Sequence, residues 1–310
     1  MTLPSNTNKE SHHHVIVLLE KLLPSMPVFN LPAPHTYELR QYDRTHPNGL
    51  ADRIQGADII IRTIVPITTA LLNDPAASSL KIIAVVGSGT DTVDLDACRA
   101  RGIVVANTPH CNTSAVAEHA IGMYFALRRS FVQSHRLTQD GEWARSRMLA
   151  RVLCGPDAKA PKTCRDEIVG ILGYGGIGQK VAAMAKALGL KALLSGRKGS
   201  WQQTDRTPFD EVTRTATVMT ICLPRTQDTI SYIPTPEFQA MQPHALLINV
   251  SRGGIVDEEA PLLGARVKDL NLITTPHTAW MAEETNENYQ RILQENVEAF
   301  VAGKPVNSVI

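Results

Sequence analysis

Residues 167–178 read EIVGILGYGGIG, an apolar run that passes at once into a glycine pattern. The run predicts a buried strand and residues 179–188 predict a helix, so the glycines fill the turn between them. There the first glycine, Gly173, makes the tight turn, Gly175 lets backbone approach a pyrophosphate, and Gly178 allows close helix–strand packing. The helix N-terminus would face the phosphates with unpaired N–H groups. The candidate dinucleotide-binding residues are Gly173, Tyr174, Gly175, Gly176, Ile177 and Gly178. A purely structural glycine turn is the alternative.

The next predicted strand, residues 191–194, ends in Ser195-Gly196-Arg197-Lys198. An NAD site normally has Asp or Glu here to bind the ribose 2′-hydroxyl, and no acid is present. Ser195, Arg197 and Lys198 are suited to a 2′-phosphate, so NADP is the preferred coenzyme and NAD remains possible. The alternative is that both cations are solvated surface charges. Further strands are predicted at residues 218–222 and 245–250.

The first hundred residues predict another α/β unit. Short runs rich in β-branched residues occur at 15–19, 58–61, 81–86 and 103–106. Each is apolar on both faces and is followed by Gly, Pro or a polar turn, which is typical of buried parallel strands. A helix is predicted at 95–101. The pattern indicates an open, mostly parallel sheet with helical connections.

A long helix is predicted at residues 116–127, with a broad apolar stripe at helical spacing. We interpret it as a core helix, although the stripe could also pack against a second copy of the chain. Residues 143–162 contain Gly155-Pro156 and Pro161, which predict a connecting loop. We expect two domains, one of residues 1–110 plus 281–310, which includes a helix at 287–301, and one of residues 111–280.

The composition is that of an ordinary globular protein of two domains. The chain has 310 residues, 43% hydrophobic and 20% charged, with a formal net charge of +1. This balance gives no indication of a nucleic acid or a membrane surface as partner. No apolar run is long enough for a transmembrane helix, and residues 1–10 lack the apolar core of a secretory signal. We therefore expect a cytoplasmic protein.

Cysteines and histidines offer little sign of a metal site. The five cysteines are widely spaced and make no C-x-x-C pair, which favours free thiols in a reducing compartment. His12-His13-His14 opens a strand-like run without a carboxylate or thiol beside it. We interpret the run as incidental and expect no bound metal.

Short motifs accompany the glycine turn over nearly the whole chain. They are 86–91 (VGSGTD), 93–94 (VD), 102–105 (GIVV), 107–109 (NTP), 116–119 (VAEH), 248–254 (INVSRGG) and 276–280 (PHTAW). Together they resemble the D-isomer-specific 2-hydroxyacid dehydrogenases, the group with glyoxylate and hydroxypyruvate reductases. The resemblance implies two Rossmann-like or flavodoxin-like domains with open parallel sheets. The first predicted domain would be the substrate domain and the second the dinucleotide-binding domain, in a homodimer.

The resemblance also implies a reaction and its residues. The substrate would be a 2-oxo acid such as glyoxylate, hydroxypyruvate or pyruvate, interconverted with a D-2-hydroxy acid. Its carboxylate would bind the backbone near Gly87 and Ser88 and the planar guanidinium of Arg252. His277 would protonate the carbonyl oxygen, and Trp280 would wall the pocket. Taken alone, Arg252 could be a loop ion pair and His277 a core histidine. The remaining coenzyme residues implied are Leu223, Pro224, Thr229 and Val250.

One segment departs from the family pattern. The INVSRGG motif and the histidine motif lie too close together, and residues 261–263 resemble family sequence found beyond a helix, a strand and a glutamate-bearing loop. The join at Ala260-Pro261 therefore indicates an internal deletion of one helix–strand unit, about 30 residues. We expect impaired catalysis, because that glutamate would hold the histidine in place. The deletion would also remove a strand from the sheet, and residues 272–274 could slide into its position. The alternatives are a catalytically dead nucleotide-binding relative, or a truncated gene product. A third alternative, a hydride-transfer enzyme that acts on formate, is less consistent with the sequence, because residues 86–91 and Arg252 fit a 2-oxo acid.

Overall fold

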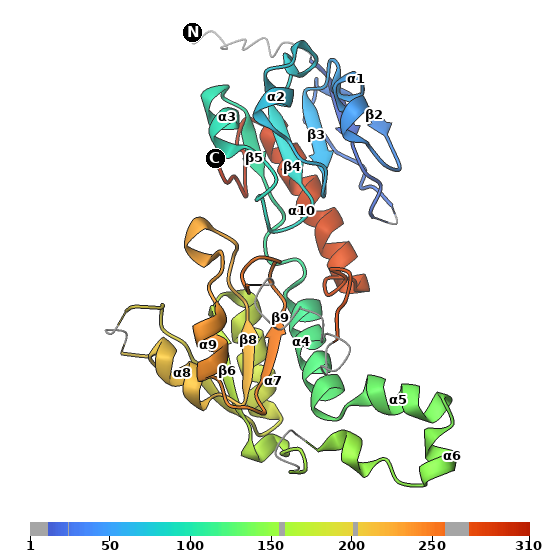
Figure 1. Ribbon diagram of the computed structural model, residues 1–310. Coiled ribbons are helices and arrows are strands. Elements are labelled where there is room, and N and C mark those ends of the chain that lie inside the picture. Colours follow the sequence, from blue (N-terminus) through green and yellow to red (C-terminus); the bar gives the residue numbers. More distant parts are fainter. Residues whose placement is uncertain (1–11, 24, 155–158, 201–203, 258–272) are drawn as a thin grey trace, which may run out of the picture. The chain divides into compact units, whose positions relative to one another are not determined.

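The computed structural model describes residues 12–23, 25–154, 159–200, 204–257 and 273–310 (Figure 1). The chain divides into two compact units, one of residues Met1–Cys111 and Ala282–Ile310, the other of residues Asn112–Met281. Among the described residues, no helix combines the length and the apolar character needed to cross a membrane. Two features of the sequence analysis lie outside the described residues. They are the join at Ala260-Pro261 and Leu272, the first residue of the segment 272–274 that could replace a lost strand.

The first unit is built on a five-stranded parallel sheet in the order β2-β1-β3-β4-β5. The strands are β1 (His13–Leu18), β2 (Thr36–Gln41), β3 (Ile59–Arg62), β4 (Ile82–Val85) and β5 (Val104–Ala106). All four residues of β3 and of β4 are buried, as expected for central strands covered on both faces. The order is that of flavodoxin-like folds, so the predicted class is confirmed for this unit.

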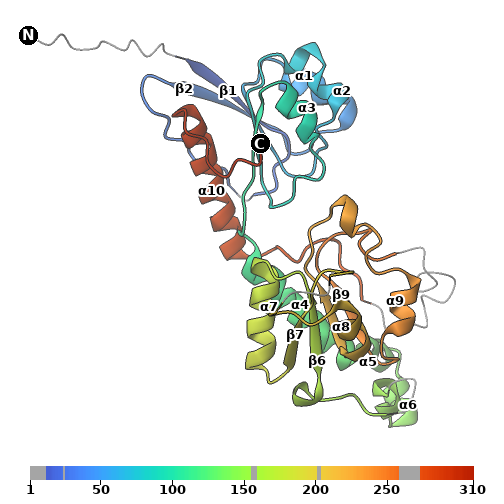
Figure 2. The same cartoon turned by 90° about the vertical axis from the view of Figure 1, so that its left-hand side faces the viewer.

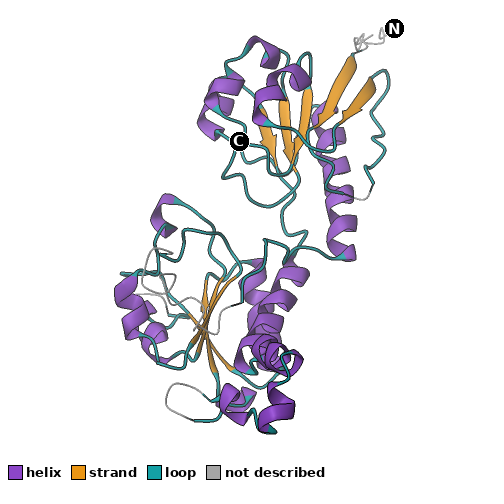
Figure 3. Ribbon diagram, turned by 45° about the vertical axis from the view of Figure 1, so that its right-hand side comes forward, coloured by secondary structure: helices purple, strands orange, loops and turns teal. Residues whose placement is uncertain are grey.

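Helices cover both faces of this sheet. The short helices α1 (Leu50–Ile54), α2 (Thr69–Leu72) and α3 (Leu95–Ala100) lie on one face, and α10 (Glu283–Val301) lies on the other (Figures 2 and 3). Two 3₁₀ turns, η1 (Pro47–Gly49) and η2 (Pro75–Ala77), complete the connections. The chain end joins the same unit, because the Val309 N–H donates to the Val105 carbonyl at 2.7 Å.

The second unit has a four-stranded parallel sheet in the order β7-β6-β8-β9 among the described residues. Its strands are β6 (Ile168–Leu172), β7 (Lys191–Leu194), β8 (Val218–Ile221) and β9 (Leu246–Asn249). Helices α4 (Thr113–Arg128) and α7 (Gly176–Ala187) pack together against one face. Helices α8 (Phe209–Thr215) and α9 (Thr235–Ala240) cover the other (Figure 2). This is the Rossmann-like half of the predicted architecture.

The long apolar stripe belongs to the interior of this unit. Val116, Ala117, Ala120, Tyr124 and Leu127 of α4 are buried. Four of these five residues join one hydrophobic cluster with β6, α7 and β8. The interpretation of α4 as a core helix is therefore confirmed.

The structure contains one strand that was not predicted and corrects one predicted loop. The edge strand β2 was not predicted, because its sequence TYELRQ is polar and none of its residues is buried. The predicted loop over residues 143–162 contains most of the helix α6 (Glu142–Ser146) and the 3₁₀ turn η3 (Ala150–Leu153), and α5 (Phe131–Gln139) precedes it. None of the residues of α5 or α6 is buried, so these helices are not part of a packed core, which is where an apolar stripe is expected. Two further 3₁₀ turns are η4 (Cys164–Asp166) and η5 (Gln227–Thr229).

Candidate coenzyme and substrate sites

The glycine turn joins β6 to α7 through two contacts that only glycine permits. Gly173 has φ +91°, and a Cβ there would lie 2.7 Å from the carbonyl oxygen of Cys222. A Cβ on Gly178 would overlap the carbonyl oxygen of Gly173. Gly178 is buried within the first turns of α7, so the helix can approach the strand closely. These two glycines set the shape of the turn.

Gly175 differs from them because nothing lies within 4 Å of the position a Cβ would take. It is the N-cap of α7 and, as a glycine, has no side chain with which to cap that end of the helix. The first N–H groups of a helix have no partner within it, and its positive dipole end favours anions. The open space beside Gly175 is of the kind that close approach of a pyrophosphate to the backbone requires. Tyr174 beside it is exposed and Ile177 is partly buried.

The residues after β7 divide into anchored and exposed ones. Ser195 pairs with Thr207 in an isolated parallel bridge, and the buried Gly196 donates to the Thr207 carbonyl at 2.8 Å. Lys198 forms an ion pair with Glu237, and its backbone N–H donates to the Tyr232 hydroxyl at 2.8 Å. Its ammonium therefore has an anionic partner within the protein. Arg197 is exposed.

Arg206 is a cation at this site that the sequence did not indicate. Its guanidinium carbon lies 4.6 Å from the centroid of the Tyr174 ring, within the range of a cation–π contact. Arg206 directly precedes Thr207, whose pairing with Ser195 brings this part of the chain back to the end of β7. The contact between Arg206 and Tyr174 could not be predicted from the sequence, because the two residues are far apart along the chain and meet only through the pairing of Ser195 with Thr207.

The turn after β8 contains Leu223, Pro224 and Thr229. The Thr229 hydroxyl donates to the Pro224 carbonyl at 2.7 Å and accepts the Thr226 N–H at 2.7 Å. Thr229 is buried, so its hydroxyl holds the turn in shape. Cys222 at the end of the strand is a protonated thiol, because burial raises its pKa to about 12.

Arg252 lies in a loop directly after β9, and Asn249 and Ser251 order that loop. The Asn249 side-chain amide donates to the Arg252 carbonyl at 2.9 Å, and its side-chain oxygen accepts the Ser251 N–H at 3.0 Å. The Ser251 hydroxyl donates to the Ile221 carbonyl at 3.0 Å, which ties the loop to β8. The Arg252 guanidinium donates to the Ser251 carbonyl at 3.1 Å. Val250 packs on the cluster beneath α4 and α7.

His277 occupies a turn in the same unit. Its φ is +57°, and its N–H donates to the Thr275 carbonyl at 2.8 Å. The ring is exposed, whereas Trp280 is partly buried. The Thr275 hydroxyl lies 3.3 Å from His119 Nε2, so this turn contacts α4. An exposed imidazole on a turn is accessible to a substrate, which a core histidine would not be.

Gly87 and Ser88 follow β4 in the first unit. The Gly87 N–H donates to the Thr108 hydroxyl at 2.7 Å, and the Asn107 amide donates to the Ser88 carbonyl at 2.8 Å. Gly87 has φ +145°, a conformation that favours glycine. Because its N–H already has a partner, binding a carboxylate there would require Thr108 to give up that bond.

The predicted coenzyme residues all belong to the second unit. The glycine turn, the residues after β7, the turn after β8 and the Arg252 loop all follow carboxyl ends of strands in one sheet. Ligands of open α/β sheets bind at that edge. The structure therefore brings the predicted coenzyme residues to one edge of the second unit.

Comparison with known proteins agrees with this geometry. The family model described as "D-isomer specific 2-hydroxyacid dehydrogenase, NAD binding domain" matches residues 121–265. The glycerate dehydrogenase of Methylorubrum extorquens is 34% identical over 307 residues, covering 91% of this chain and 93% of the relative. The glyoxylate reductase of Thermococcus litoralis is 26% identical, covering 94% and 96% of the two chains.

A solved structure shows the same arrangement. An acyclic imino acid reductase in complex with NADPH and D-Arg is 25% identical, with a TM-score of 0.77 over 96% of this chain and 100% of that chain. Family match, curated relatives and fold agree. The chain therefore belongs to the D-isomer-specific 2-hydroxyacid dehydrogenase family.

Proposed function

We propose that this chain is an NADPH-preferring reductase of a small 2-oxo acid, such as glyoxylate, hydroxypyruvate or pyruvate, and forms the D-2-hydroxy acid. The observation that carries the proposal is the open Gly175 position at the N-terminus of α7, in a chain of this family. The second unit would be the coenzyme domain, and the first unit the substrate domain. The names of the similar dehydrogenases and reductases support the substrate class. A cytoplasmic homodimer remains our expectation.

The chemistry follows from three side chains of the second unit. The Arg252 guanidinium would bind the substrate carboxylate through two parallel N–H groups. His277 would donate a proton to the carbonyl oxygen, and Trp280 would help enclose the substrate. The bound coenzyme supplies the hydride that reduces the carbonyl carbon.

The preference for NADPH is supported by the residues after β7. The sequence from Ser195 to Ser200 contains no acid that would bind a ribose 2′-hydroxyl. Arg197 is exposed, and Arg206 stacks on Tyr174 beside the glycine turn. Lys198 contributes less than its sequence position implied, because Glu237 already neutralises it. Fluorescence titration tests the preference, and equal affinities for NADPH and NADH would contradict it.

We further propose that turnover is slow because the glutamate-bearing segment is missing between Ala260 and Pro261. The family match ends at residue 265, before His277. The alignment with the glycerate dehydrogenase is 307 positions long, but only 91% of the 310 residues of this chain lie in it. The other positions of the alignment are therefore residues of that relative that have no counterpart in this chain. The family's glutamate would orient the histidine, and loss of positioned acid–base catalysis costs about 10²- to 10⁴-fold in rate.

The test compares the 310-residue chain with a version in which a family helix–strand–Glu segment is restored after Ala260. We expect glyoxylate reduction by the original chain at no more than about a hundredth of the restored rate. Equal rates would mean that another residue replaces the glutamate. If NADPH binds and neither chain turns over, the alternative of a nucleotide-binding relative without catalysis is supported.

A further inference from the structure

A cluster of histidines lies at the amino edge of the first unit's sheet. In a parallel sheet, the residues that precede neighbouring strands lie side by side. The order β2-β1-β3-β4 therefore places His35, His12, Asp58 and Lys81 in a row, and His14 on β1 is on the same face of the chain as His12. This edge is opposite the one where Gly87 follows β4.

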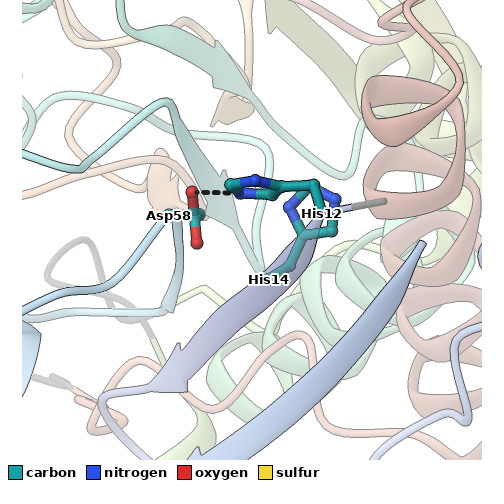
Figure 4. Close-up of side chains that lie close together, drawn as sticks. All are labelled: His12, His14 and Asp58. Carbon is teal, nitrogen blue, oxygen red and sulfur yellow. Dashed lines mark hydrogen bonds and ion pairs between the residues drawn. The ribbon is translucent and has the colours of Figure 1, made fainter. Parts of the chain in front are cut away.

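Three of these side chains converge on one point (Figure 4). One ligand atom each from His12, His14 and Asp58 lies within 4.8 Å of the others. His12 Nε2 is 3.1 Å from Asp58 Oδ1, and the rings of His12 and His14 are 4.5 Å apart between centroids. His14 and Asp58 are buried, with 5% and 6% of their surface exposed, so the strands hold both in place.

His14 has a nitrogen that needs a partner. Its Nε2 lies 3.0 Å from His35 Nδ1, and its Nδ1 is buried without a hydrogen-bond partner among the described residues. If His14 Nε2–H donates to His35, the lone pair on Nδ1 is directed into a buried space where a polar atom is costly to leave unpaired. A histidine that binds a metal typically donates its other ring N–H to a neighbouring acceptor in this manner.

Lys81 now occupies the cation position of the cluster. Its ammonium lies 2.7 Å from Asp58 Oδ1 and 3.3 Å from His12 Nε2. Its side chain is 48% exposed, so its ammonium has access to solvent. A metal ion and the ammonium would compete for the same carboxylate.

We infer that His12, His14 and Asp58 form a Zn²⁺ site, with His35 orienting His14 and Lys81 as a competing internal cation. Two imidazoles and a carboxylate are a ligand set that Zn²⁺ accepts, with water in the fourth position. The site lies at the amino edge of the sheet, away from Gly87 and Ser88. Its metal would therefore tie β1 to β3 and stabilise the first unit, without entering the reduction of substrate.

The experiment uses the untagged full chain, freed of metal with a chelator and titrated with Zn²⁺ by calorimetry. Co²⁺ serves as a spectroscopic probe of the ligand set. We expect stoichiometric binding that raises the unfolding temperature. His12→Ala should weaken binding at least about tenfold, and His35→Ala should weaken it by about 10- to 100-fold through loss of orientation.

Two further variants make the test specific. His13→Ala is the matched control, because His13 is exposed and bonds Thr36 instead of the cluster, so its affinity for Zn²⁺ should be unchanged. Lys81→Ala should bind Zn²⁺ more tightly, because the competing ammonium is gone. Absence of stoichiometric binding, equal losses in His12→Ala and His13→Ala, or weaker binding by Lys81→Ala would each overturn the proposal. Circular dichroism checks that every variant is folded.

Discussion

At the scale of single residues, glycines of one motif have different surroundings. Gly178 is required by packing, since a Cβ there would overlap the Gly173 carbonyl oxygen, whereas Gly175 faces open space. The sequence motif treats the two glycines alike, and the structure shows that packing requires only Gly178 of this pair. Substitution by alanine at each position tests whether Gly175 serves coenzyme binding instead.

Gly178→Ala should destabilise the second unit, because overpacking of a close contact costs about 1–3 kcal/mol. Gly175→Ala should leave the unfolding midpoint nearly unchanged, because its φ of −78° suits alanine and its Cβ meets nothing. The same variant should lose NADPH affinity, since the added methyl fills the phosphate position. Urea unfolding and coenzyme titration measure the two effects. Similar losses of stability in both variants would contradict the assignment of packing to Gly178 and of coenzyme binding to Gly175.

Arg206→Ala should weaken NADPH binding more than NADH binding, if its guanidinium beside Tyr174 faces the 2′-phosphate. A charge-assisted hydrogen bond contributes about 1.5–3 kcal/mol, so a loss of about tenfold or more in NADPH affinity is expected. Arg197→Ala should act in the same direction. Arg214→Ala on α8, an exposed arginine outside the site, is the control. An equal loss for both coenzymes would assign Arg206 to the shared part of the ligand.

The cysteines should differ widely in reactivity. Burial raises the pKa of Cys98 and Cys111 to about 11 and that of Cys222 to about 12, whereas Cys154 is exposed. Since the thiolate is the reactive form, only about one part in 10⁴ of a thiol like Cys222 is reactive at pH 8. Alkylation of the native chain followed by peptide mapping should modify Cys154 first. Rapid labelling of Cys222 would show that its strand end opens.

At the scale of elements, an ion pair fastens α4 to the sheet of the second unit. Arg128 Nε lies 2.5 Å from Glu167 Oε1, and both side chains are at least nine-tenths buried. Arg128 also donates to the carbonyls of Thr217 and His244 at 3.1 Å, and Thr217 donates to Glu167. These residues precede β6, β8 and β9, so one arginine organises the amino edge of the sheet.

Glu167→Ala should cost about 3–5 kcal/mol of unfolding free energy, because it leaves the Arg128 charge buried without its partner. The exposed pair Arg145 and Glu142 on α6 provides the control, and Glu142→Ala should leave the urea midpoint unchanged. A small effect of Glu167→Ala would mean that water reaches Arg128 and replaces the carboxylate.

A helix or strand was predictable from the sequence where its own residues show apolar spacing typical of that element. The buried strands β3 and β4 and the stripe of α4 are apolar at the right spacing, so they were found. Strand β2 takes its stability from pairing with β1, which its polar sequence does not reveal. Arg206 reaches Tyr174 only through the bridge of Ser195 to Thr207, and the ion pair of Lys198 with Glu237 depends on α9. Contacts between distant segments are set by tertiary packing, which local patterns cannot encode.

At the scale of the whole molecule, the two units have separate hydrophobic cores. A ligand stabilises the part of a protein that binds it. NADPH should therefore slow amide hydrogen exchange in β6, α7 and the end of β7, and leave the strands β1 and β3 unchanged. Exchange measured by mass spectrometry with and without NADPH tests this, with NADH as the weaker ligand. Protection confined to the first unit would place the coenzyme elsewhere.

The order of the units along the chain has a consequence for biosynthesis. The second unit is inserted into the first, whose strands are translated before the second unit and whose helix α10 is translated after it. Leu293 and Val297 of α10 are fully buried, so one face of the first sheet lacks its cover until the helix leaves the ribosome. At about 5–20 residues per second, that interval is on the order of 10–40 s. During it the nascent strands expose an apolar surface, which makes this chain a natural client for chaperones that bind during translation.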